Sequence, residues 1–143
     1  MNENALRLTN RELFYTAMML HLDQLVNVDY IYPFEENELR QELNDAKKTL
    51  RKKKLLKENA KGEVSMDASL AACASICAKP EECVIKKSGE YYATLYGAGG
   101  AYMLLEREPE EQLAALWFQD RASADTYLAD KIGSAENDDG GNE

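Results

Sequence analysis

Histidine is nearly absent from this sequence, which holds a single one, His21, in 143 residues. Nucleophilic catalysis usually needs a serine, cysteine or similar group beside a base that a third side chain orients. No motif surrounds any serine, and the single histidine leaves few candidates for a base. Because no nucleophile–base pair can be assembled from these residues, we expect a protein that is not an enzyme.

Cysteine is also scarce, and its count is odd: Cys73, Cys77 and Cys83. Three cysteines and His21 could form a zinc set, but the spacing lacks the C-x2-C knuckle of such sites. Cys73 and Cys77 share an apolar face of a predicted helix among small neighbours. We therefore expect buried, reduced thiols with no metal and no other cofactor.

The sequence lacks any apolar run of the length that spans a membrane, about 20 residues. Met1–Thr9 is polar, so it has no apolar core of a secretory signal peptide. Together with the odd number of cysteines, these absences favour a cytoplasmic protein without contact to a membrane.

Basic side chains are outnumbered, 17 to 26, which gives a net charge of −9. An excess of negative charge opposes non-specific binding to nucleic acids and acidic membranes. Four of the acids lie in the polar segment Ser134–Glu143, which has no base and no periodicity. The sequence therefore predicts a single domain over residues 1–133 followed by an acidic disordered tail over 134–143.

The first part of the chain, residues 9–80, has helical periodicity. Thr9 and Glu12 have the spacing of a capping box, Asp67 can cap a later helix, and Pro80 can end it. Leu39, Leu43, Ala46 and Leu50 form a helical stripe. The predicted elements are helices over Asn10–Val26, Glu35–Leu56 and Ala68–Ala78, a connector over Asn27–Pro33, and a wing-like hairpin of Leu55–Glu58 and Glu63–Met66.

The second part, residues 82–133, is divided by turn signals into short runs rich in aliphatic and aromatic residues. This pattern is typical of antiparallel strands joined by hairpins. A closing helix over Arg121–Ile132, capped by Asp120 and ended by Gly133, follows. The predicted strands of this four-stranded meander are Cys83–Lys86, Tyr91–Tyr96, Ala101–Arg107 and Leu113–Phe118. The fold class we expect is α+β.

A basic run ends the second predicted helix and suggests an alternative function. Helix, basic helix and hairpin in succession resemble a winged helix, a fold that places a basic helix in the major groove of DNA. The net negative charge argues against this alternative. So does the placement of the bases, which surround the apolar stripe and do not form one face that could read base edges. A solvated helix end explains the run more simply. The residues concerned are Lys47, Lys48, Arg51, Lys52 and Lys54.

The tyrosines of the predicted meander are its most suggestive feature. Alternation makes both faces of the sheet apolar, so one face must pack on helices and the other must be covered by another helix or another chain. The candidate partner-binding residues are Tyr92, Tyr96, Gly99, Tyr102 and Leu104. On the last strand, Leu113, Ala115 and Trp117 are the candidate residues of a sheet face in a homodimer.

The order of these elements resembles one half of the EspG-like proteins associated with type VII (ESX) secretion. The resemblance covers about Leu8 to Ile132 and includes the helix LTNRELFYTAMMLHLD, the turn LRKKKLLKENAKGEVSMD and the segment AKPEECV. It implies a cytosolic chaperone or adaptor that binds helical secreted substrates. Because that family has two quasi-equivalent halves, the resemblance also implies that a homodimer supplies the second half.

Overall fold

The computed structural model describes residues 5–28, 35–110 and 112–136, with side chains as far as Ile132. It confirms the α+β class, and the chain divides into two compact units. A helical unit comprises Leu8–Lys79, and a sheet unit comprises Met1–Arg7 with Pro80–Glu143. Most of the predicted connector Asn27–Pro33 and the predicted tail from residue 137 onward lie outside the described residues.

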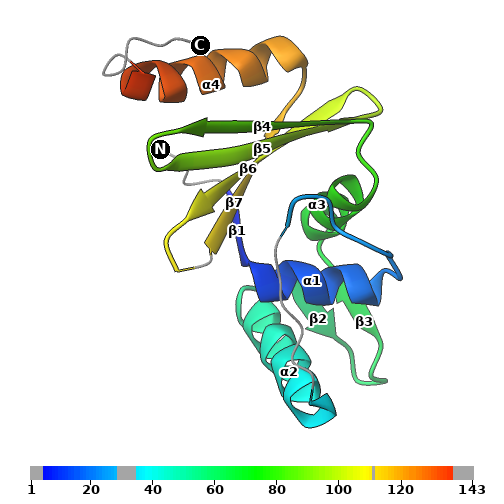
Figure 1. Cartoon of the computed structure of the whole chain (residues 1–143). Coiled ribbons are helices and arrows are strands. Elements are labelled where there is room, and N and C mark those ends of the chain that lie inside the picture. Colours follow the sequence, from blue (N-terminus) through cyan, green and yellow to red (C-terminus); the bar gives the residue numbers. More distant parts are fainter. Residues whose placement is uncertain (1–4, 29–34, 111, 137–143) are drawn as a thin grey trace. The chain divides into compact units, whose positions relative to one another are not determined.

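The helical unit contains α1 (Asn10–Met19), α2 (Glu36–Lys52), β2 (Leu56–Glu58), β3 (Val64–Met66) and α3 (Ala68–Ala78) (Figure 1). Helix α1 packs on both α2 and α3. The predicted helix caps and hairpin are present, since Thr9 caps α1 in a capping box with Glu12, Asp67 caps α3, and β2 pairs with β3 antiparallel. The apolar faces that helical periodicity predicts form the core of this unit. Its buried side chains include Leu13, Ala17, Ala46, Leu50, Leu70, Cys73 and Cys77.

Two helices end earlier than predicted, at Met19 rather than Val26 and at Lys52 rather than Leu56. Both end in the same hydrogen-bond pattern, in which the chain turns through a left-handed residue, His21 at φ 59° and Lys54 at φ 66°. After α1, the Leu22 amide donates to the Ala17 carbonyl at 2.9 Å, and after α2 the Leu55 amide donates to the Leu50 carbonyl at 2.9 Å. This is the Schellman motif, which usually has glycine at the left-handed position. Neither position is glycine, so no local residue signals the end of either helix.

The sheet unit contains β4 (Glu82–Ser88), β5 (Tyr91–Ala98), β6 (Ala101–Glu108), β7 (Gln112–Phe118) and α4 (Arg121–Glu136). The four strands pair antiparallel in chain order, as the meander prediction required. Gly99 and Gly100, at φ 59° and 83°, form the two-residue turn between β5 and β6. Positive φ at both central residues is the geometry that suits a tight hairpin.

A fifth strand, β1 (Leu6–Thr9), was not predicted and lies beside β7, giving the order β1-β7-β6-β5-β4 (Figure 1). Its four residues are too short a pattern, with no turn signal beside them, to predict a strand from the sequence. Arg7 is joined to the sheet by two side-chain hydrogen bonds to Glu108, at 3.2 and 3.3 Å.

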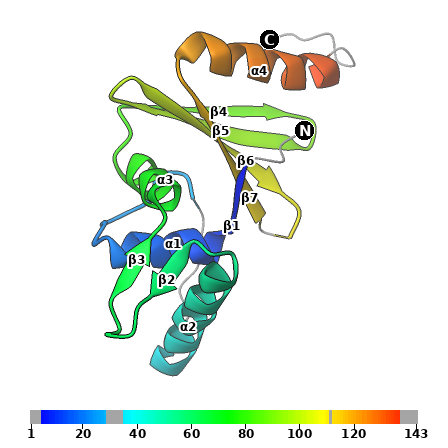
Figure 2. The ribbon, with the colours of Figure 1, turned by 180° about the vertical axis from the view of Figure 1, so that it is seen from behind.

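Helix α4 covers one face of the sheet, as Figures 1 and 2 show from opposite sides. Asp120 caps it as predicted, because its carboxylate accepts from the Ser123 amide at 2.8 Å. The prediction that Gly133 ends this helix was wrong, since α4 continues to Glu136 and includes the first residues of the predicted tail. The core beneath α4 is centred on Ala93, Leu95, Leu104, Ala124 and Leu128.

Candidate protein-binding surface

The five predicted partner-binding residues do not form one surface. The strand register pairs Tyr96 with Met103 and Leu95 with Leu104. Because neighbours in register share a face, Tyr102 and Leu104 lie on the α4 side of the sheet, while Tyr92 and Tyr96 lie on the other side. Leu104 and Tyr96 are fully buried, and of the five only Gly99, at the hairpin turn, is exposed.

Leu104 and Tyr102 belong to the core under α4 rather than to a contact surface. The ring of Tyr102 lies over the backbone of Gly97, where an added Cβ would come within 2.7 Å of the Tyr102 Cε1 atom. Glycine inside a strand often marks such a close approach. The assignment of these two residues to partner binding is therefore corrected to a packing role.

The predicted dimer residues on β7 also change role. Leu113 and Ala115 are buried, and only Trp117, 39% exposed, is accessible. Strand β7 lies between β1 and β6, so neither of its edges is open to another strand. A second copy could therefore not add a strand beside β7, and Trp117 is the accessible member of the predicted face.

Two tyrosines and a buried carboxylate fix α4 to the sheet. The Glu106 Oε2 atom accepts from the Tyr91 hydroxyl at 2.8 Å and from the Tyr127 hydroxyl at 2.7 Å. Burial raises the pKa of Tyr91 well above its ordinary value. The hydrogen bond to Glu106 and the negative charge of that carboxylate raise this pKa further. The hydroxyl therefore stays protonated and serves as a hydrogen-bond donor. Near the start of the helix, Arg121 forms an ion pair with Glu82 of β4.

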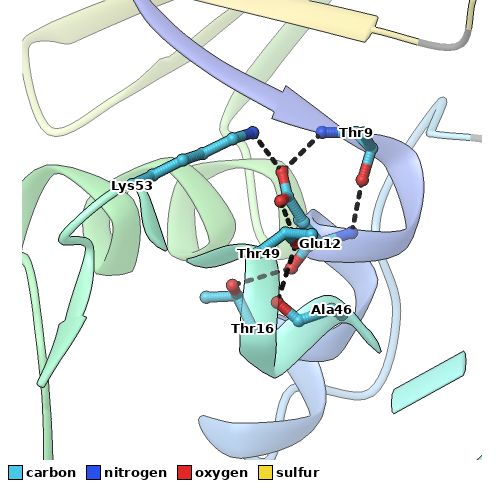
Figure 3. A network of polar contacts seen from close by, with 6 residues as sticks. All are labelled: Thr9, Glu12, Thr16, Ala46, Thr49 and Lys53. Carbon is cyan, nitrogen blue, oxygen red and sulfur yellow. Dashed lines mark hydrogen bonds and ion pairs between the residues drawn. The ribbon is translucent and has the colours of Figure 1, made fainter. Parts of the chain in front are cut away.

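A second buried carboxylate organises the helical unit (Figure 3). Glu12 is 1% exposed. Its carboxylate accepts hydrogen bonds from the Thr9 amide at 2.9 Å, from Lys53 Nζ at 2.6 Å and from the Thr49 hydroxyl. Lys53 and Thr49 come from the end of α2 and Glu12 from the start of α1, so the network joins the two helices. These donors offset the cost of burying the charge of Glu12 between the two helices.

Part of the basic run is paired with acidic side chains of the same unit. Lys47 and Arg51 lie 3.9 and 3.4 Å from Glu58, and Lys53 pairs with Glu12. Lys48, Lys52 and Lys54 are exposed. The helical unit holds eleven basic and eleven acidic residues, so the whole net charge of −9 belongs to the rest of the chain. The electrostatic excess that DNA binding requires is therefore missing from this unit.

The cysteines follow the prediction only in part. Cys73 and Cys77 are buried on α3, but Cys83 is exposed on β4. Within the described ranges, no group of three or more His, Cys, Asp or Glu side chains is arranged to hold a metal ion. Nor, in the same part of the chain, is any helix both long and apolar enough to cross a membrane.

The open edge of the sheet was not predicted from the sequence. Among the described strands, β4 ends the sheet and has β5 as its single neighbour. Its face away from α4 carries Cys83, Ile85 and Lys87, all exposed, and Ile85, at 49%, is the most exposed large hydrophobic residue described. On β5, Tyr92 lies opposite Lys87, and its ring centroid is 3.8 Å from the Cζ atom of Arg107. Charged side chains therefore flank the apolar centre of this face at one end. An open strand with an exposed aliphatic side chain is suited to bind another strand.

No family model matches the chain, and a search of curated protein sequences gives no match to it.

Proposed function

We propose that this protein is a non-enzymatic protein-binding module that uses β4 as its docking strand. The observation that carries the proposal is that β4, seven residues long, has one strand neighbour and presents Ile85 to solvent. A strand at the end of a sheet holds a row of backbone N–H and C=O groups that face away from its neighbour. An extended segment can satisfy these groups by adding one strand to the sheet.

The side chains of β4 would supply the specificity. Backbone hydrogen bonds give a strand-addition complex its affinity, while alternate side chains choose the partner. Here the alternate positions on the face away from α4 are Cys83 and Ile85, which are apolar, and Lys87, which is charged. A partner segment with apolar residues followed by an acidic one would match that order.

The finer proposal is a cytoplasmic chaperone or adaptor for substrates of type VII secretion. It is supported by the resemblance of the element order to EspG-like proteins, and it names a helical secreted protein as the partner. In this proposal an extended segment that flanks the helices of the substrate would pair with β4. The apolar hairpin loop at Gly99 and the exposed Trp117 would offer further contacts.

Replacing Ile85 with lysine should weaken binding of the partner about tenfold or more, because a charge replaces the central apolar contact, and each 1.4 kcal/mol corresponds to a factor of ten. The matched control is Val64→Lys on β3, since Val64 is a large hydrophobic residue of similar exposure, 36%, outside the sheet unit. The measurement is calorimetric titration with a small helical protein of the kind that type VII systems secrete, including the extended segment that flanks its helices. Equal affinity for the Ile85 variant and the native chain would refute a docking role for β4.

A further inference from the structure

The sequence of β4 is complementary to itself when read in the opposite direction. It runs Glu-Cys-Val-Ile-Lys-Lys-Ser, with an acidic start, an apolar centre and a basic end. Glu82, Val84 and Lys86 lie on the α4 side of the strand, and Cys83 and Ile85 lie on the other side. The α4-side placement follows from the register, which pairs Val84 with the core residue Leu95.

Antiparallel pairing of two β4 strands about a two-fold axis at Val84 matches every central position. Each Glu82 then faces Lys86 of the second copy, each Cys83 faces Ile85, and Val84 faces its own counterpart. Opposite charges and apolar pairs directly across a ladder are stabilising, whereas mismatched pairs are not. Moving the register by one residue places Lys86 opposite Cys83, and moving the axis to Ile85 places Lys86 opposite Val84.

We infer that β4 binds β4 of a second copy of this chain, in the register centred on Val84. This inference rests on the proposed role of β4 as a docking strand: the second copy occupies the edge when no substrate is bound, and a substrate strand competes for the same edge. The pairing would make one continuous sheet of both copies, with the two α4 helices on the same face, because directly opposed residues point to the same side. Glu82 also pairs with Arg121 of its own α4, so the carboxylate is held in position on the α4 side before the second copy arrives.

Local charge makes the second copy a better occupant of this edge than an acidic or a basic segment. β4 carries one acid and two bases, and Glu81, which immediately precedes it, adds a second acid at the same end. A uniformly charged partner would meet like charge at one end of β4. A second β4, running antiparallel, places unlike charges together at both ends.

A disulfide can report this register directly. In the inferred pairing Cys83 faces residue 85 of the second copy, and opposed residues of antiparallel strands have Cα atoms about 4.5 to 5.5 Å apart, within the range that a disulfide bridges. The variant Ile85→Cys should therefore form a covalent dimer under mild oxidation, seen on a non-reducing gel. Ile85 is half exposed, so the substitution leaves the core intact.

The matched control is Ile85→Cys combined with Cys83→Ser, which keeps the new thiol but removes its facing partner. It should stay monomeric on the same gel, because residue 85 of one copy does not face residue 85 of the other. A monomer in both variants, or equal cross-linking in both, would overturn the inference. The proposed function fails separately: if the dimer forms but Ile85→Lys leaves substrate binding unchanged, β4 pairs copies and does not bind substrate.

Discussion

Replacing Leu104 with alanine should lower the free energy of unfolding of the sheet unit by about 2 to 5 kcal/mol. Leu104 is fully buried in the centre of β6, in the core cluster that packs under α4. The substitution removes its apolar contacts and leaves a cavity that the flanking strands β5 and β7 can close only in part. The measurement is denaturant unfolding followed by fluorescence, because Trp117, the single tryptophan, lies in the neighbouring strand β7.

Ile85→Ala is the matched control for this experiment. It also removes an aliphatic side chain from the sheet, but from a position that is 49% exposed, so its effect should stay below about 1 kcal/mol. If Leu104→Ala left stability unchanged and instead weakened partner binding, Leu104 would be a surface residue, as the alternation alone suggested, and the packing of α4 on this face would be wrong.

Replacing Glu12 with alanine should lower the free energy of unfolding of the helical unit by about 3 kcal/mol. The change removes a charge-assisted bond to Lys53, worth about 1.5 to 3 kcal/mol, and half of the capping box of α1, worth about 1 kcal/mol. It also leaves the Thr49 hydroxyl without its acceptor on Glu12. Far-ultraviolet circular dichroism during denaturant unfolding would measure the loss, since this unit contains no tryptophan.

Glu36→Ala controls for the loss of a helix-terminal acid. Glu36 lies in the first turn of α2 and pairs with Arg40 at 3.1 Å, but its side chain is 84% exposed. Exposed pairs of this kind contribute about 0.3 to 0.5 kcal/mol. Similar losses for the two variants would contradict the view that burial makes the Glu12 network important.

Local signals predicted most of the fold. Gly89, Gly99 and the segment around Pro109 separate the strands of the meander, and Asp67 and Pro80 bound α3, so these elements needed no tertiary information. The predicted ends of α1 and α2 were wrong because His21 and Lys54 adopt a left-handed backbone conformation that glycine usually occupies. Strand β1 was missed because its partner β7 lies about a hundred residues further along the chain, and pairing at that separation leaves no local pattern.

The candidate site was harder to predict than the fold. Alternation gives the two faces of each strand, but not how the faces of neighbouring strands match, so Tyr92 and Tyr96 were wrongly grouped with Tyr102 and Leu104. It also does not tell which face a helix will cover. The edge of the sheet depends on strand order, and β1 closes the β7 side while β4 stays open. In the same way, the capping box predicted one contact of Glu12, whereas its ion pair with Lys53, 41 residues away, depends on how α1 packs against α2.

The proposed role of β4 is to accept a second strand, and amide hydrogen exchange of the native chain tests this role most directly. Backbone amides of β4 that point away from β5 have no strand partner in the single chain, so they should exchange fast when the protein is dilute. As the protein concentration rises, exchange at Glu82–Ser88 should slow, while exchange in the hairpin β2–β3 stays the same. Exchange in β4 that does not change with concentration, or protection that appears at another surface instead, would contradict this role of β4.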